Sequence, residues 1–444
     1  MRRRRKELKM TQSELAEGII SVPYLSLIEN ERANPPADVI SPLAQRLKMS
    51  LHELQGISDP LVLKEAHLLI EKIRFSMFNE EHENCRHYLQ KLEEFSPLIR
   101  DEKLLMKIDL IRINVMDQQL QAERAKQLLH SFEQKWVNFQ SCPDTFVSYL
   151  RMKGNIEICQ GNYMKAIQHY QTALPLFAEM KDELEKGYLY TNLACSYLLL
   201  TKPQMGVIYS EKAIAILSQM DRWQELIAVY HIMGCCYVHM GEHDEAQQYF
   251  ERMLKMSQQM SGISPLFTAR AYHEMGTTKH QLDYYDEALQ YFALALKTAK
   301  SEDDDPLPYW EVGKIFESMT KTYLKKGQLE QAERYLNKAL QLLDNHHISL
   351  AESWIQLGHL HYAKGEFSSF EQVYMNAITV FIEHENYSKV ARAAHALGLY
   401  FHNQGDEGKS SHWSRLACEY YAKLVPVGEF DHILPTQIEN NNPT

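Results

Sequence analysis

The side chains of this sequence best suited to chemistry are its 20 histidines and seven cysteines, because imidazole and thiolate groups bind metals and act as acids, bases or nucleophiles. No predicted helix carries a His-x-x-x-His or Cys-x-x-Cys pair, and the inward-facing histidines lie about 40 residues apart. No glycine-rich phosphate loop or nucleophile elbow is present, although a dispersed Ser/His/Asp triad remains open. We therefore expect no metal, no cofactor, no catalytic residue and no enzyme activity.

The cysteines are scattered along the chain, at Cys85, Cys142, Cys159, Cys195, Cys235, Cys236 and Cys418. Most of them fall on inward-facing positions of predicted helices, so we expect reduced thiols in the core of a cytoplasmic protein. The adjacent pair Cys235 and Cys236 leaves a redox switch as the alternative.

A second set of polar side chains recurs at the same places of a repeated pattern and could bind an extended peptide. An Asn amide can bond both the N–H and the C=O of a peptide, and Arg or Lys can hold a carboxylate. The set comprises Asn155, Asn192, His231, Arg270, His273, Glu274, His280, Glu317, Lys321, His359, Arg392, His395 and His402. Large hydrophobic residues lie between them, which suits a peptide; solvated polar surface is the alternative.

The elements that position this set are helical hairpins, which the spacing of small residues predicts. From Gly234 the intervals to Gly241, Ala246 and Met253 are 7, 5 and 7 residues, and this pattern occurs seven times. The copies begin at Gly154, Ala194, Gly234, Gly276, Thr320, Gly358 and Gly398. Small residues let two antiparallel helices approach closely, and the second position, usually Gly, makes the turn. Such pairs cannot bury their apolar faces alone, so neighbours stack into a superhelix with a concave surface.

Positive charge is concentrated at the N-terminus. Residues 1–9 hold six cationic side chains against the single carboxylate of Glu7, a formal charge of +5. The whole chain carries −11, which leaves −16 for residues 10–444. This asymmetry indicates contact with a polyanion at one end of the protein, with a solvated helix surface as the alternative.

Residues 1–58 predict short helices without the repeat spacing. Thr11 and Glu14 have the spacing of a capping box, which begins one helix. A tight turn then leads to a helix over residues 22–30, and two further helices follow at residues 39–47 and 51–54.

Two motifs carry a family resemblance. Thr11-Gln12-x-x-Leu15-Ala16-Glu17-x-Ile19, followed by Tyr24-Leu25-Ser26-x-Ile28-Glu29-Asn30, resembles the Cro/repressor-type helix-turn-helix. The seven copies resemble tetratricopeptide repeats, although their step is nearer 40 residues than 34. Joined in one chain, the motifs resemble the RRNPP-type peptide-sensing regulators of Gram-positive bacteria, in particular their NprR- and PlcR-like members. The resemblance implies an all-α fold, with an N-terminal helix-turn-helix domain followed by a right-handed superhelix of tetratricopeptide-like helical hairpins.

The resemblance also implies roles for individual residues. In such a motif one helix enters the major groove of double-stranded DNA, and phosphate contacts orient the domain. Nearest the bases would lie Ser21, Val22, Pro23, Tyr24 and Ser26, and at the phosphates Arg2, Arg3, Arg4, Arg5, Gln12, Asn30 and Arg32. Packing is the alternative for Tyr24, and Glu29 is expected to be structural. Asn192, in Tyr190-Thr191-Asn192-Leu193-Ala194, resembles the asparagine with which these sensors hold the peptide backbone.

We expect four segments along the chain. They are a helix-turn-helix DNA-binding domain at 1–58, degenerate helical repeats at 59–146, seven tetratricopeptide-like repeats at 147–425 and a C-terminal tail at 426–444. A separate three-helix bundle is the alternative for residues 59–146.

The resulting hypothesis is a cytoplasmic, homodimeric transcription regulator of the quorum-sensing type, switched by a short signalling peptide on the concave face. Its longest apolar runs are too short to cross a bilayer, so no membrane partner is expected. One alternative is a Rap-like regulator that binds a phosphorelay response regulator and would need a glutamine such as Gln90, Gln118 or Gln119. The other is a tetratricopeptide scaffold with a vestigial DNA-binding head.

Overall fold

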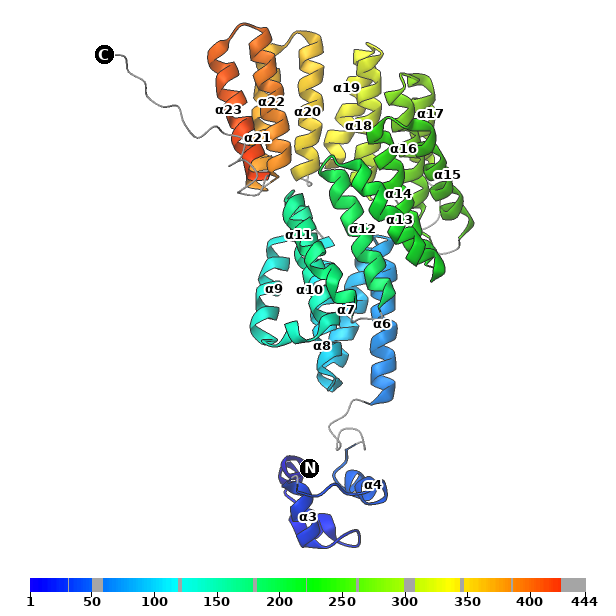
Figure 1. Ribbon diagram of the computed structural model, residues 1–444, viewed down its shortest axis with the longest axis vertical. Helices are drawn as coiled ribbons and strands as arrows, with labels where there is room; N and C mark the ends of the chain where they lie inside the picture. The colour runs from blue at the N-terminus through cyan, green and yellow to red at the C-terminus, as the bar shows by residue number, and fades with distance from the viewer. Residues whose placement is uncertain are drawn as a thin grey trace, which may run out of the picture. The chain divides into compact units, whose positions relative to one another are not determined.

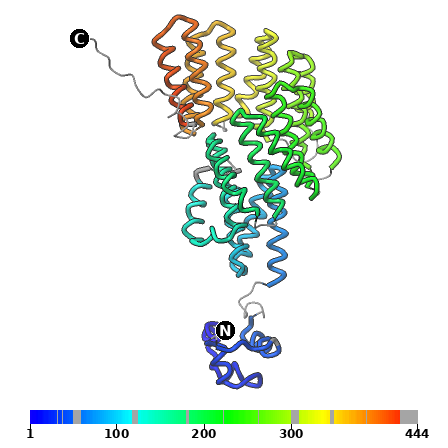
Figure 2. The backbone as a smooth tube through the Cα atoms, in the orientation of Figure 1, coloured from blue at the N-terminus to red at the C-terminus, as the bar shows by residue number. Residues whose placement is uncertain are grey.

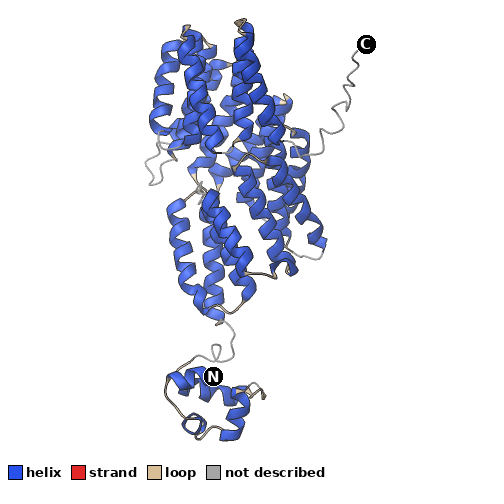
Figure 3. Ribbon diagram, turned by 90° about the vertical axis from the view of Figure 1, so that its left-hand side faces the viewer, coloured by secondary structure: helices blue, strands red, loops and turns tan. Residues whose placement is uncertain are grey.

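The computed structural model describes residues 1–30, 32–49, 59–118, 122–178, 182–220, 222–260, 263–298, 308–343, 347–384 and 386–424. Every regular element in these ranges is a helix, and no strand occurs among them (Figure 3). The chain divides into two compact units. Figure 1 labels most of their helices. One unit comprises residues 1–119 and 128–139, and the other comprises residues 120–127 and 140–444.

The N-terminal head contains α1 (Arg2–Glu7), α2 (Gln12–Ala16), α3 (Val22–Glu29) and α4 (Ala37–Arg46). The predicted capping box opens α2, because the Thr11 hydroxyl accepts from the Glu14 N–H and the Glu14 carboxylate accepts from the Thr11 N–H. At the other end of α2, the Arg46 guanidinium donates to carbonyl oxygens that the helix leaves unpaired. The core between the helices holds Leu15, Leu25, Leu43 and Leu47. The helix predicted at 51–54 lies outside the described residues.

Four longer helices follow: α6 (Pro60–Phe78), α7 (His82–Phe95), α8 (Glu102–Gln118) and α9 (Ala122–Lys135). Short 3-10 helices, η1 (Ser96–Leu98) and η2 (Phe139–Ser141), lie after α7 and α9. The core shared by α6, α7 and α8 includes Leu69, Ile73, Leu92 and Ile108. The interpretation of this region as degenerate repeats stays a prediction.

The seven predicted copies of the repeat each form a pair of helices. The pairs are α10 (Pro143–Cys159) with α11 (Tyr163–Ala173), α12 (Glu183–Leu199) with α13 (Pro203–Gln219), α14 (Trp223–Met240) with α15 (His243–Gln259), α16 (Pro265–Gln281) with α17 (Tyr285–Thr298), α18 (Tyr309–Lys325) with α19 (Leu329–Leu343), α20 (His347–Lys364) with α21 (Phe367–Glu383), and α22 (Tyr387–Asn403) with α23 (Glu407–Leu424). A 3-10 helix, η3 (Leu174–Ala178), extends the first pair.

Packing between the two helices of a pair explains the small residues of the repeat. A Cβ atom added to Gly154 would lie 2.2 Å from the ring of Tyr170, and one added to Gly234 would lie 2.4 Å from the ring of Phe250. Both rings are fully buried, so the first helix can approach the second only where it lacks a side chain. The turn residue Gly241 has a φ of 81°, a left-handed conformation that favours glycine.

The first helices of the pairs lie on the inner side of the array. From α10 to α20, consecutive first helices contact one another directly as well as contacting their own partners. In a curved array the helices on the inner side lie closest together, so these contacts place the first helices from α10 to α20 on the concave face. Figure 2 follows the backbone of the successive pairs by colour along the sequence.

All seven cysteines are free thiols. Cys85 and Cys236 are buried, as expected of core thiols. Cys159 and Cys418 are exposed, so for these two cysteines the expectation of a core position is wrong. Burial raises the pKa of Cys236 to about 12, which keeps this thiol protonated and disfavours the redox alternative.

Candidate functional sites

The N-terminal end of α3 is exposed. Ser21, Val22 and Pro23 face solvent, whereas Tyr24 and Ser26 are half-buried. Ser21 also caps the helix, because its hydroxyl accepts a hydrogen bond from the Tyr24 N–H. The residues predicted to lie nearest the bases thus share one accessible helix end, which is the part of a recognition helix that contacts bases.

The predicted phosphate contacts fall into two groups. Arg2, Arg3, Asn30 and Arg32 are exposed, and Arg4 is half-buried. The side chain of Arg3 is 94% exposed and pairs only with Glu7, one turn away. Arg4 also donates to the Leu47 carbonyl oxygen and pairs with Glu7, and the Asn30 amide donates to the Ser26 carbonyl oxygen. The phosphate contacts of these residues stay a prediction.

Arg5 and Gln12 instead contact Glu29 inside the head. Arg5 Nε lies 2.7 Å from Glu29 Oε1 and Nη2 lies 2.9 Å from Oε2, while the Gln12 amide donates to Oε2 at 2.8 Å. The Glu29 side chain is fully buried, and hydrogen bonding from Arg5 lowers the pKa of its carboxyl group. The three residues join α1, α2 and α3, so Glu29 has the structural position expected of it. Both side chains thus pair with Glu29 in this structure, and their predicted phosphate contacts stay a prediction.

Polar contacts join consecutive first helices along the inner face. Arg151 of α10 pairs with Glu185 of α12 at 2.6 Å, and the Tyr188 hydroxyl of α12 donates to Glu225 of α14 at 2.9 Å. Farther along, Arg270 Nε of α16 donates to Glu311 of α18 at 2.7 Å. These contacts connect successive repeats, and they occupy Arg270, which was predicted to contact the peptide.

Two predicted peptide contacts lie side by side at the start of the array. The Asn192 amide donates to Asn155 Oδ1 at 2.8 Å, and the Tyr170 hydroxyl donates to the same oxygen at 2.8 Å. The two amides therefore orient each other on α10 and α12.

A cavity of about 520 Å³ opens between α16, α18, α20, α21 and α22. Five predicted peptide contacts line it: His273, Glu317, Lys321, His359 and Arg392. Its apolar wall includes Ile355, Phe381 and Ala393, and its further polar lining includes Lys314, Ser318, Glu352, Gln356 and Lys389. A volume of 300–1,000 Å³ with apolar walls and a few polar groups is typical of a ligand site.

Positive charge prevails in this cavity. Lys314, Lys321, Lys389 and Arg392 line it, whereas Glu352 pairs with Lys389 at 2.6 Å. Burial raises the pKa of Glu317 to about 7, so this carboxyl group is only partly ionised at neutral pH. Burial also lowers the pKa of both His273 and His359, which keeps these imidazoles neutral. The cavity therefore suits a ligand that carries a carboxylate beside an apolar group.

The other predicted peptide contacts lie outside this cavity lining: Asn155, Asn192, His231, Arg270, Glu274 and His395. His280 lies beside Thr322, with Nδ1 2.9 Å from the hydroxyl, and His395 and His402 are exposed. Among the cavity residues that the repeat positions missed, Lys314 lies seven residues and Ser318 three residues before Lys321 on α18. That helical spacing is a signal that could have identified them.

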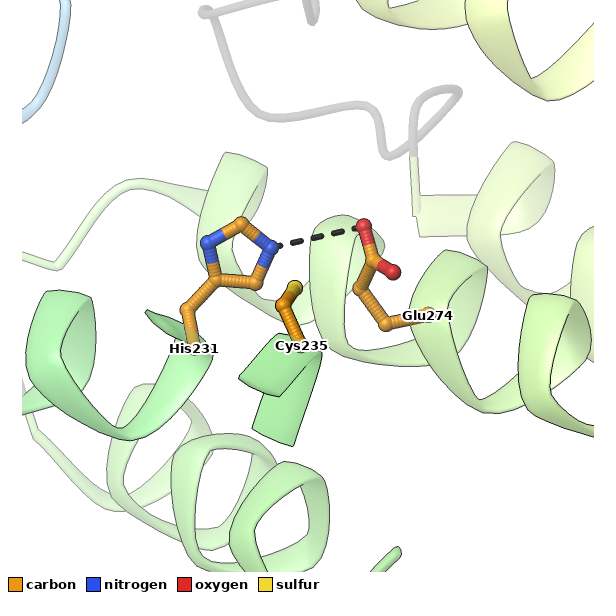
Figure 4. Close-up of side chains that lie close together, drawn as sticks. All are labelled: His231, Cys235 and Glu274. Atoms are coloured by element: carbon orange, nitrogen blue, oxygen red, sulfur yellow. Dashed lines mark hydrogen bonds and ion pairs between the residues drawn. The ribbon is translucent and has the colours of Figure 1, made fainter. Parts of the chain in front are cut away.

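A third group of side chains meets on α14 and α16. His231 and Cys235, one turn apart on α14, lie with Glu274 of α16 so that one donor atom from each falls within 4.8 Å of the others. His231 Nε2 is 3.3 Å from Glu274 Oε1, and the three side chains point toward one another (Figure 4). Burial opposes ionisation of Glu274, but the hydrogen bond from His231 and the neighbouring charges outweigh it and lower the pKa of Glu274 to about 2. Imidazole, thiol and carboxylate together could hold a metal ion. The His-x-x-x-Cys spacing was the available sequence signal.

Two known protein families match parts of this chain. It matches the helix-turn-helix family over residues 1–54, and the tetratricopeptide repeat family over residues 225–301 and 321–344.

Two bacterial regulators are similar in sequence. Transcriptional activator NprA of Geobacillus stearothermophilus is 26% identical over 250 residues, which cover 55% of this chain and 58% of NprA. Regulatory protein RapD of Bacillus subtilis (strain 168) is 24% identical over 256 residues, which cover 57% of this chain and 70% of RapD. The matched region thus spans less than two thirds of NprA.

Solved structures share the fold. A Rap protein complexed with competence and sporulation factor superposes with a TM-score of 0.62 at 16% identity, covering 82% of this chain and 99% of that chain. The apo form of the quorum sensor NprR from B. thuringiensis gives a TM-score of 0.57 at 14% identity, covering 81% of this chain and 98% of that chain.

The head and the array together define a helix-turn-helix protein with a tetratricopeptide-repeat superhelix, which confirms the predicted fold class. The sequence similarity to NprA and the fold shared with NprR confirm the predicted resemblance to the RRNPP-type regulators. No helix in the described ranges is both long enough and apolar enough to span a lipid bilayer.

Proposed function

We propose that this protein is a peptide-responsive transcriptional regulator that binds double-stranded DNA through its head and a short signalling peptide on the inner face of its repeats. The observation that carries the proposal is the presence in one chain of an exposed recognition-helix end and a cation-lined cavity. The homologue NprA is named a transcriptional activator and the structural relative NprR a quorum sensor, which supports both halves.

In the DNA-binding half, α3 enters the major groove with Ser21, Val22 and Pro23 toward the bases. Arg2, Arg3, Asn30 and Arg32 contact phosphates, which orient the head without specifying sequence. Arg5 and Gln12 contribute indirectly, because they fix α3 through Glu29. Two heads of a homodimer would contact half-sites about 34 Å apart or a multiple of that distance.

In the peptide-binding half, the cavity holds one end of a short peptide. Lys321 and Arg392 take a carboxylate, either the C-terminus or an acidic side chain, and the wall of Ile355 and Phe381 takes an apolar side chain. Asn155 and Asn192, elsewhere on the inner face, contact the backbone of the same peptide.

The switch couples these halves through the curvature of the array. A bound peptide contacts several first helices at once, so it favours one rotation between repeats and changes the separation of the heads in the dimer. To move the equilibrium from 1:99 to 99:1, the peptide must prefer one state by roughly 10⁴-fold, or about 5.5 kcal/mol.

The peptide half is tested by fluorescence anisotropy with short synthetic peptides that carry an apolar residue beside a free C-terminal carboxylate. We expect the carboxylate form to bind more tightly than the C-terminal amide. Lys321→Gln should weaken binding about tenfold or more, because a hydrogen bond to a charged group contributes about 1.5–3 kcal/mol. Lys338→Gln is the matched control, because Lys338 lies over the Tyr335 ring of α19 and is absent from the cavity lining. Equal binding of acid and amide, with no effect of Lys321→Gln, would refute this role.

The similarity to RapD favours a second candidate function, a Rap-like regulator that binds a phosphorelay response regulator. Of the glutamines that it would need, Gln90 is exposed on α7, and the side chains of Gln118 and Gln119 lie outside the described residues. Accelerated loss of phosphate from a response regulator by the full chain, abolished by Gln90→Ala, would favour this candidate.

A further inference from the structure

We propose that His231, Cys235 and Glu274 form a binding site for a zinc-type divalent metal ion on the inner face of the array. This inference is independent of the proposed function, because neither DNA binding nor the peptide cavity requires it. It rests on the convergence of three different metal-binding groups from two successive repeats.

The geometry is close to that of a tetrahedral site. Zinc binds imidazole nitrogen and carboxylate oxygen at about 2.0–2.2 Å and thiolate sulfur at about 2.3 Å, so its ligand atoms lie about 3.3–3.8 Å from one another. His231 Nε2 and Glu274 Oε1 are already 3.3 Å apart, and every pair of donor atoms lies within 4.8 Å. Side-chain rotations that move an atom by about 1 Å or less would complete the three contacts.

The backbone supports this arrangement. His231 and Cys235 are four residues apart on α14, so both project from the same face of one helix. Glu274 belongs to α16, which contacts α14 directly. His273, the residue before Glu274 on α16, has its Nδ1 3.8 Å from the same carboxylate oxygen, Oε1, so a second imidazole lies beside the group.

The donor set selects the type of ion. Sulfur and nitrogen ligands favour zinc and cobalt over magnesium or calcium, which prefer oxygen. All three residues are half-buried, so an ion can reach them from the inner face and keep one position for water or another donor. When the metal–sulfur bond forms, the Cys235 thiol proton leaves to solvent, and one proton is released for each ion bound.

The competing interpretation is a hydrogen bond between His231 and Glu274 beside an ordinary half-buried thiol. A metal ion would instead connect successive repeats and stabilise their relative rotation. The two interpretations differ in whether the thiol becomes a ligand, which spectroscopy detects directly.

The test uses the full chain, reduced, stripped of metal and carrying Cys159→Ser and Cys418→Ser to remove the exposed thiols. Cobalt(II) titration should reach one ion per chain, with a sulfur-to-cobalt charge-transfer band that zinc(II) abolishes by displacement. Cys235→Ser should remove the band and Glu274→Gln should weaken cobalt binding at least tenfold, because even outer groups contribute 10- to 100-fold at metal sites. The matched control is Cys236→Ala, in which the neighbouring buried thiol is lost and the band should persist.

Thermal unfolding provides a second readout that does not depend on colour. Zinc(II) should raise the Tm of the parent chain and of Cys236→Ala, but leave that of Cys235→Ser unchanged. The proposal is overturned if no charge-transfer band appears at stoichiometric cobalt, or if band and Tm shift survive in Cys235→Ser. Peptide and DNA binding would be unaffected by that result.

Discussion

The N-terminal head contains a buried ion pair that joins its helices. Glu29 on α3 is held by Arg5 of α1 and Gln12 of α2, and the Arg5 side chain is only 10% exposed. Removing one partner of a buried ion pair leaves the other charge desolvated and unpaired, which costs more free energy than the pair contributes. The orientation of α3 therefore rests on these three side chains.

Glu29→Gln should lower the free energy of unfolding of the head by about 3–5 kcal/mol, since Arg5 would stay buried without its carboxylate. Hydrogen exchange of the α1–α3 amides, measured by mass spectrometry on the full chain, reports this directly. Arg3→Gln is the control, because the exposed Arg3 should change stability by no more than about 0.5 kcal/mol. Unchanged exchange in Glu29→Gln would show that the buried pair does not hold α3.

Glu317 gives the repeat array a pH dependence whose sign follows from its raised pKa. The carboxyl group keeps its proton to about pH 7 in the folded array but loses it near pH 4.3 in the unfolded chain. Its contribution to stability is therefore fully present below about pH 4.3 and is lost as the pH rises through about 7.

Glu317→Gln, which cannot ionise, should thus become more stable relative to the parent chain as the pH rises from 5 to 8, by an amount on the order of 3 kcal/mol. Urea unfolding at several pH values measures the difference between the two proteins, so titration of other groups cancels. A difference that stays constant across this range would mean that Glu317 ionises normally.

At the scale of the helical pair, close approach of the backbone to an aromatic ring determines the packing. Gly234→Ala would place a methyl group 2.4 Å from the Phe250 ring, and overpacking of this kind costs about 1–3 kcal/mol. Gly241→Asn is the matched control in the same pair, because no atom lies within 4 Å of its Cβ and Asn tolerates the left-handed turn. We expect a clear fall in Tm for the first variant and a small one for the second. If the two variants lowered the Tm equally, contact with the Phe250 ring would not determine the distance between the two helices of the pair.

The hairpins could be predicted because they follow from local spacing. A small residue, a turn and two further small residues recur in the sequence itself, and Thr11 and Glu14 identify a helix start in the same way. The contacts between repeats could not be predicted. Arg270 and Glu311 are 41 residues apart, and the cavity combines Lys321 with Lys389 from another pair. Which of these side chains meet depends on the rotation between successive hairpins, and no local pattern encodes that rotation.

At the scale of the whole molecule, the proposal requires that events in the array change the activity of the head. In the proposed function, the +5 charge of residues 1–9 would attract DNA to the N-terminal end of the chain, whereas residues 10–444 carry −16. A homodimer with two heads doubles the phosphate contacts, so its affinity for DNA should depend steeply on salt.

The most direct test of this account is retention of the upstream DNA of its own gene by the full chain, in a salt series with and without a peptide that binds the cavity. We predict sequence-specific retention whose log affinity falls against log salt by about 0.9 for each phosphate contacted, and a shift in that affinity when the peptide is added. Arg2→Gln with Arg3→Gln should make the slope shallower, and Lys321→Gln should remove the response to peptide but not DNA binding. Absence of specific retention, or retention that the peptide never changes, would contradict the account.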